Sequence, residues 1–155
     1  MNILKLIIAI AVPLAVGFFG SLVTAPAIDG WYAELAKPAL NPPGWVFGPV
    51  WTLLYVLMGA AAFLVWQKGL ESKAVRVALG LFVIQLVLNG VWSLIFFGLQ
   101  NPLGALVDII VLWILIVCTM IAFYRVSPVA MYLLVPYLLW VSFAVYLNAA
   151  FVILN

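Results

Sequence analysis

Residues 103–124 read LGALVDIIVLWILIVCTMIAFY, an apolar run that holds one charged residue, Asp108. A helix of about 20 apolar residues, at about 1.5 Å per residue, is long enough to cross the hydrocarbon core of a bilayer. The run lacks the alternation of polar and apolar residues that is typical of a transmembrane β-strand. The stretch therefore predicts a membrane-spanning α-helix.

The same pattern recurs along the whole chain of 155 residues, of which 70% are apolar and 6% are charged. Soluble domains carry about 25% charged residues. We expect an all-α integral membrane protein, a five-transmembrane-helix bundle that forms one domain over residues 1–155. The predicted spans lie at about 5–25, 46–66, 76–99, 103–124 and 129–153, with a longer loop at about 26–45.

The first apolar run has some features of a signal peptide, since Lys5 precedes it and Ala25-Pro26-Ala27 follows it. Its apolar stretch is long for a signal sequence, and prolines crowd the position at which cleavage would occur. We therefore expect the run to be retained as the first span.

Basic residues predict the orientation in the membrane. Five spans place the termini on opposite sides. One side then carries five basic residues, whereas the other carries only Lys37, in the first loop. Because Lys and Arg accumulate in cytoplasmic loops, we expect a cytoplasmic N-terminus, with the first loop and the C-terminus outside. The five residues are Lys5, Lys68, Lys73, Arg76 and Arg125.

The composition argues against several kinds of site. The chain has no His and a single Cys, Cys118, within a predicted span. Disulfides, thiolate metal sites and His-based catalytic triads are therefore not expected. We expect no metal site and no required cofactor. The charges form no basic stripe, so we expect no nucleic-acid partner.

The first loop is predicted to be ordered, because it is rich in proline and aromatic residues. A short helix is expected over residues 31–36, capped by Asp29 and ended by Pro38. Pro42-Pro43 then favours an extended stretch, and Pro49 suits the first turn of the second span. A long loop of this kind is usually functional or disordered, and this composition favours function.

In each of three predicted spans, amides and aromatic rings fall on one face of the helix. In lipid such groups face the protein interior. Interhelical hydrogen bonding or an interfacial aromatic belt would explain many of them individually. Together with the loop, they favour a cavity for a flat, mostly apolar ligand. The faces comprise Gln85, Asn89, Trp92, Ser93 and Phe96; Tyr137, Trp140, Ala144 and Asn148; and Trp51, Tyr55 and Gly59.

The residue types also indicate which ligand would fit such a cavity. Aromatic faces, amides and one cation at the mouth suit a planar macrocycle that carries carboxylates, with Lys37 meeting an acid group. A sterol is the competing fit. For Asp108 two readings stand equal: a buried carboxyl that is kept neutral by desolvation or meets Lys37 or an amide, or one that reaches the nearby interface.

Three stretches carry a resemblance to a known family, the tryptophan-rich sensory protein / translocator protein (TspO/MBR) family, which includes the peripheral benzodiazepine receptor. They are WYAELAKPALNPPGWVFGPVW at 31–51, LNGVWSLIFFG at 88–98 and PYLLWVSFAVYLN at 136–148. Their order and spacing cover the second to fifth spans.

The resemblance implies a five-helix bundle, commonly dimeric, whose first loop closes over a pocket. Members bind porphyrins such as haem, other tetrapyrroles, drug-like molecules and in some cases cholesterol. We also expect the protein to lie in a prokaryotic cell membrane. Family pocket positions correspond to Tyr32, Trp51, Asn89, Trp92, Trp140 and Ala144. With neighbours from the same faces, the expected ligand-binding set is Tyr32, Lys37, Trp51, Tyr55, Asn89, Trp92, Phe96, Trp140, Ala144 and Asn148.

The sequence departs from the family pattern at two places. Leu40 stands where many members have an aromatic residue. Residues 147–153 lack the Tyr and basic residue of the animal cholesterol consensus, so this route to sterol binding is not expected. For a homodimer contact, small residues near Gly59–Ala62 and at Gly80 are candidates.

Three functions follow as hypotheses. The leading one is a tetrapyrrole receptor or carrier with a role in transport or stress regulation. The second is light-dependent porphyrin degradation, in which Trp51 and Trp140 would relay the oxidation. The third is a small-molecule transporter that depends on Asp108 as the acid within a span.

Overall fold

The computed structural model describes residues 2–155, and within this range it is helical and contains no strand. Five helical stretches are long and apolar enough to cross a membrane, which confirms the predicted fold class. The elements are α1 (Ile3–Ile28), α2 (Trp31–Glu34), η1 (Gly44–Val46), α3 (Phe47–Trp66), α4 (Lys73–Ser93), η2 (Leu94–Gly98, π-helical), α5 (Pro102–Val126), α6 (Pro128–Leu133) and α7 (Val135–Leu154).

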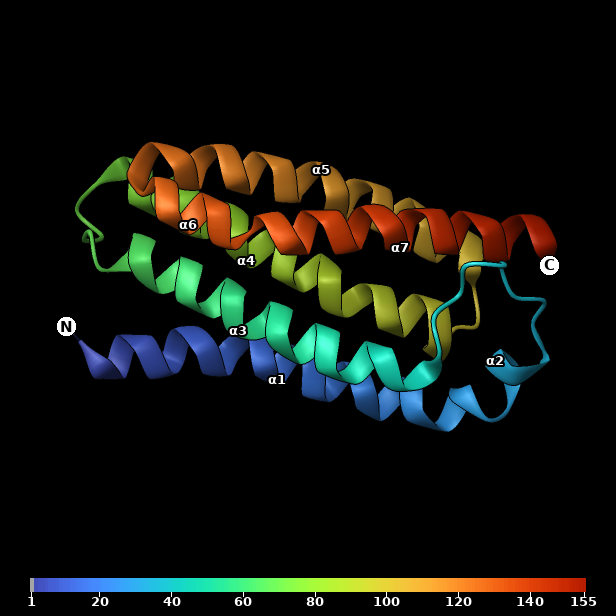
Figure 1. Cartoon of the computed structure of the whole chain (residues 1–155). Helices are drawn as coiled ribbons and strands as arrows, with labels where there is room; N and C mark the ends of the chain where they lie inside the picture. Colours follow the sequence, from blue (N-terminus) through green and yellow to red (C-terminus); the bar gives the residue numbers. More distant parts are fainter. Residues whose placement is uncertain (1) are drawn as a thin grey trace.

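The long helices lie side by side along one axis, and the two termini are at opposite ends of the bundle (Figure 1). The loop that carries α2 lies at the same end as the C-terminus (Figure 1). α1 packs mainly on α3, and α5 packs on both α4 and α7. This arrangement agrees with five spans of alternating direction.

Polar side chains mark the points at which several spans begin. Each accepts a hydrogen bond from a backbone N–H of the first turn, which would otherwise lack a partner. The Asn101 cap of α5 is followed by Pro102, whose missing N–H costs nothing at this position. The caps are Asn2 for α1, Ser72 for α4, Asn101 for α5 and Ser127 for α6.

Glycines allow α1 and α3 to approach closely. A Cβ atom on Gly59 would lie 2.5 Å from the Ile10 Cα and 2.6 Å from the Ala9 carbonyl oxygen. A Cβ on Gly17 would lie 2.5 Å from the Tyr55 ring. Gly59–Ala62 is therefore used for packing within the chain, so it is not the dimer contact that we considered. The exposed Gly80 stays a prediction.

The first loop differs from expectation in detail. α1 continues past Pro26 to Ile28, so Asp29 ends α1 instead of capping α2. Gly30 takes the N-cap position of α2 and makes no side-chain cap bond. α2 ends at Glu34, because Leu35 is already extended, with φ −72° and ψ 144°. The short helix is present, but the predicted cap is wrong and its end precedes Pro38.

The fifth span is not one continuous helix. It breaks at Leu134 between α6 and α7, and Pro136, in the first turn of α7, has no N–H to continue the ladder. α6 packs against α3, whereas α7 makes few contacts with α3. The break therefore separates α7 from α3 in the half of the bundle nearer the first loop.

Candidate ligand site inside the bundle

A chain of hydrogen bonds links three helices in the interior. The Tyr55 hydroxyl of α3 donates to Asn89 Oδ1 of α4 at 2.6 Å. Asn89 Nδ2 donates to the Tyr137 hydroxyl of α7 at 2.9 Å, and that hydroxyl donates to Gln85 Oε1 at 2.7 Å. All four side chains are buried. The structure thus brings the predicted polar faces of these three spans together.

Trp51 adds an aromatic surface to this polar chain. Its ring stacks on Tyr55 with centroids 5.6 Å apart, and it meets the Tyr137 ring edge-on at 6.4 Å. Trp51 is partly buried against the core. The contacts fix the orientation of both tyrosine rings, whose hydroxyls bind Asn89.

A second layer lies nearer the first loop. Trp92 Nε1 donates to Asn148 Oδ1 at 2.9 Å, and Asn148 Nδ2 donates to the Pro102 carbonyl at 2.8 Å. The Trp92 ring stacks on Phe96 at 5.0 Å. Asn148 therefore holds an indole from α4 and the start of α5, which is the inward role expected for an amide in a span.

The first loop closes this end of the bundle. The Tyr32 ring packs against Phe97 and Phe151, each with centroids 5.6 Å away, and its hydroxyl accepts a bond from Asn41 Nδ2 at 3.2 Å. The Ala36 N–H donates to Asn155 Oδ1, and Asn155 Nδ2 donates to the Ala36 carbonyl, both at 3.0 Å. The loop therefore contacts η2 through Phe97, α7 through Phe151, and Asn155 directly after α7.

Lys37 is exposed and bound to its own loop. Its Nζ donates to the carbonyls of Tyr32, Ala33 and Leu35 at 3.1, 3.3 and 3.2 Å, and lies 5.0 Å from the centre of the Tyr32 ring. An ammonium has three N–H donors, so all of them are engaged. Lys37 caps the end of α2, and it forms no ion pair with Asp108.

Asp108 lies on the buried face of α5 and is 8% exposed. Among residues 2–155 its Oδ2 has no hydrogen-bond partner, and the same is true of the Gln85 Nε2. Of the two readings of Asp108, burial is the one that the structure supports. Within the described part of the chain, Asp108 makes no contact with Lys37 or with an amide, which was one of the two options for a buried carboxyl.

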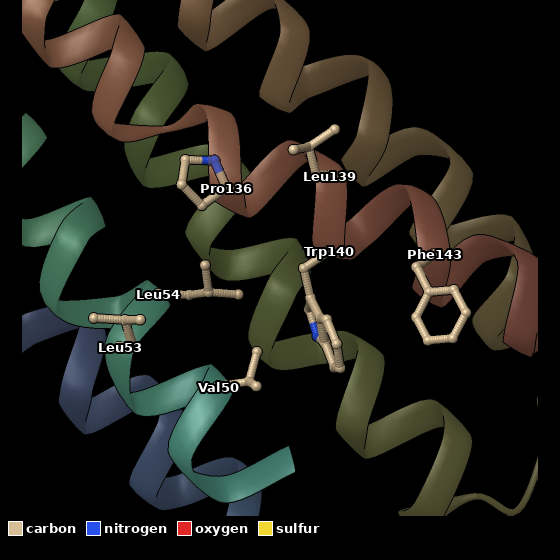
Figure 2. Close-up of a pocket in the computed structure, with 7 residues that line it drawn as sticks. All are labelled: Val50, Leu53, Leu54, Pro136, Leu139, Trp140 and Phe143. Carbon is tan, nitrogen blue, oxygen red and sulfur yellow. The ribbon is translucent and has the colours of Figure 1, made fainter. Parts of the chain in front are cut away.

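A groove lies between α3 and α7, with a volume of about 380 Å³ (Figure 2). Trp140 is the predicted site residue that lines it, and every lining side chain is apolar. Trp140 meets Phe47 edge-on at 6.0 Å and the tilted ring of Phe143 at 5.8 Å. The lining comprises Val50, Leu53, Leu54, Pro136, Leu139, Trp140 and Phe143.

The ten predicted residues therefore fall into distinct places. Tyr55, Asn89, Trp92 and Asn148 bond to one another or to near neighbours inside the bundle, with Trp51 and Phe96 packed on them. Tyr32 and Lys37 belong to the closed loop. Trp140 lines the groove, which opens at the side of the bundle, and Ala144 is half-buried one turn further along α7.

Sequence reasoning missed most of the groove. Val50, Leu53, Leu54, Leu139 and Phe143 look like any other apolar residue of a span. The available signal was positional, because Val50 and Leu54 flank Trp51 while Leu139 and Phe143 flank Trp140. That spacing does not tell a groove wall from a lipid-facing surface.

Comparison with known proteins agrees with this architecture. The TspO/MBR family matches residues 9–154. The tryptophan-rich protein TspO of Chlorobaculum tepidum is 53% identical over 154 residues, 99% of this chain and 98% of that protein. The TspO of Archaeoglobus fulgidus is 48% identical over 155 residues, 100% and 99% of the two chains. The human translocator protein is 48% identical over 120 residues, 76% of this chain and 70% of that protein.

Proposed function

This chain belongs to the TspO/MBR family, and we propose that it is a membrane receptor or carrier that binds porphyrins such as haem and related flat, apolar ligands. It is an integral membrane protein, with five apolar helices long enough to span a bilayer. The proposed ligand lies against Trp140 in the groove between α3 and α7, next to the interior aromatic residues.

The state of the Trp140 ring carries this proposal. The indole borders a hollow of about 380 Å³, and neither Phe47 nor Phe143 lies parallel to it, with interplanar angles of 69° and 56°. Because Trp140 is partly exposed and lines the groove, a flat ring in the groove can meet the indole in an offset or edge-to-face arrangement. The rest of the lining is aliphatic or aromatic, as expected for a site that holds an apolar ligand.

The proposal extends to orientation and partners. The N-terminus is cytoplasmic, and the first loop and C-terminus are outside, because five of the six basic residues then lie inside. A bacterial and an archaeal relative support a prokaryotic membrane.

The chain also forms a homodimer, and the exposed Gly80 face of α4 is the candidate contact. A contact between a ligand carboxylate and Lys37 stays a prediction, because all three Lys37 N–H donors bind carbonyls of its own loop.

The test is a titration of the purified protein with protoporphyrin in the dark, followed by quenching of tryptophan fluorescence. Trp140→Phe is expected to weaken binding by less than about tenfold, because a whole aromatic pair contributes about 0.5–1.5 kcal/mol beyond the area that it buries and the smaller ring keeps part of it. The matched control is Trp113→Phe. Trp113 of α5 donates to Ser142 at 2.8 Å and does not line the groove, so its loss should leave the affinity unchanged.

An unchanged affinity for protoporphyrin in both Trp140→Phe and Trp51→Phe would rule out the proposed binding site. The same samples test light-dependent degradation, which the stacking of Trp51 on Tyr55 near the groove favours as a second function. Porphyrin absorbance that falls faster under light in the wild type than in the Trp51→Phe/Trp140→Phe double variant would support an enzymatic degradation of porphyrin. Equal bleaching would indicate ordinary photodamage.

A further inference from the structure

The loop end of the bundle is held by directional contacts, beside a hollow of about 280 Å³ that Trp31, Phe151 and Asn155 help to line. A ligand that entered there would have to break the paired bonds between Ala36 and Asn155 and separate Tyr32 from Phe97 and Phe151. The Trp31 ring also meets Phe96 edge-on at 5.6 Å. Entry by this route requires several contacts to be lost together.

The side of the bundle is held differently. Figure 2 shows the Trp140 side chain extending from α7 across the gap toward Val50 of α3, with α4 behind it. Trp92 and Trp113 each donate an indole hydrogen bond, to Asn148 and Ser142. Within residues 2–155, the Trp140 indole makes no such bond. Its rotation would break only apolar contacts.

The groove is also open at the side of the bundle, on the surface of the predicted spans. Leu53 and Leu139, which line it on α3 and α7, are 58% and 66% exposed, and both lie within the spans. Val50 and Leu54 are about 9–15 Å from the start of their helical stretch at Gly44, at 1.5 Å per residue. This depth corresponds to the lipid tails, where a bilayer is wholly apolar. A ligand dissolved there meets no polar side chain in the groove.

We propose that the ligand enters and leaves sideways, from the bilayer, through the groove between α3 and α7, with Trp140 as the gate and the first loop closed. The inference rests on the proposed function, since it concerns the route of the same ligand. The groove exists because the break at Leu134 separates α7 from α3. α4 lies behind Trp140 (Figure 2), and the ligand occupies the groove in front of it.

The experiment compares two crosslinks in a Cys118→Ala background, which removes the only native thiol. Leu53→Cys with Leu139→Cys, joined by a bifunctional maleimide, closes the groove. Ala36→Cys with Asn155→Cys, joined in the same way, fixes the loop to α7. Binding of protoporphyrin from lipid vesicles is followed by stopped-flow tryptophan quenching, before and after each crosslink.

The groove crosslink should slow association at least about tenfold, as expected when a gating motion is blocked. It should slow the release of preloaded protoporphyrin in parallel, whereas the loop crosslink should change both rates by less than about twofold. The reverse pattern would overturn the side route. If the uncrosslinked protein showed no saturable quenching, the proposed function itself would fail, which is a separate result.

Trp140→Ala tests independently whether the Trp140 side chain controls ligand entry. A residue that only forms a wall affects release and leaves association unchanged, since interface changes act mainly on dissociation. Removal of a gate should instead speed association as well, by about threefold or more under gating control. An unchanged association rate in Trp140→Ala would contradict the gate assignment, whatever the affinity.

Discussion

The interior at Asn89 and the groove between α3 and α7 are neighbours that are held together in different ways. Around Asn89, four buried side chains from three helices are joined by hydrogen bonds of 2.6–2.9 Å. In the groove, α3 and α7 face each other with apolar side chains alone. One region is fixed by directional bonds, and the other is not.

The difference matters because the surroundings are hydrocarbon. Lipid tails are as apolar as leucine, so burial of an apolar side chain between helices gives little advantage over its contact with lipid. Hydrogen bonds and close backbone packing must then determine how the helices are placed. The Asn89 region therefore sets the position of α3, α4 and α7, and the groove is free to exchange lipid for a ligand.

The largest effect is expected from Asn89→Leu. The substitution removes the bond that Asn89 accepts from Tyr55 and the one that it donates to Tyr137, and it leaves the buried Tyr55 hydroxyl without its acceptor. Interhelical hydrogen bonds in membranes contribute about 0.6–2 kcal/mol each, so the free energy of unfolding should fall by about 1–4 kcal/mol. Reversible unfolding in mixed micelles measures this.

The matched control for Asn89→Leu is Ser142→Ala, which removes the exposed bond from Trp113 between α5 and α7. That bond also joins two helices, but it does not belong to the interior chain. Its loss should cost less than half as much. If both variants lost the same stability, the interior chain would have no special role in holding the bundle.

Much of the fold could be predicted because it depends on composition. Runs such as residues 103–124 have few alternatives to a spanning helix. The inward faces were also predictable, since an amide such as Asn89 is costly in contact with lipid. Which partner each amide takes was not, because Tyr55 and Tyr137 become its neighbours only through the packing of three helices.

The groove could not be predicted for a physical reason. It depends on the break at Leu134, and a proline at position 136 fits either a bent helix or a new one. The contacts of Lys37 were not predictable for a related reason. Its position in the loop suggested a free cation, but its chain is long enough to bind the carbonyls of the same short helix.

Trp140→Ala should have a smaller effect on stability than Asn89→Leu, although it removes far more atoms. A Trp→Ala change in a close-packed core costs about 3–5 kcal/mol. Here one side of the ring borders the groove, and lipid can fill the space that the ring leaves. We expect a loss below about 1.5 kcal/mol in the same unfolding assay. A loss of 3 kcal/mol or more would mean that the groove is held as rigidly as the interior.

The smallest effect on global stability is expected from Asn155→Ala, which extends the comparison to the loop. The substitution removes both bonds between Asn155 and Ala36, which lie at an exposed end of the bundle. Exposed bonds exchange with water, so the free energy of unfolding should fall by less than about 1 kcal/mol. Hydrogen exchange should nevertheless rise at Ala36 and Asn41 and stay unchanged at Asn89, because loops open locally without unfolding the core. If exchange at Asn89 rose equally, the loop and the interior would open as one unit, and the distinction between fixed and loosely held regions would fail.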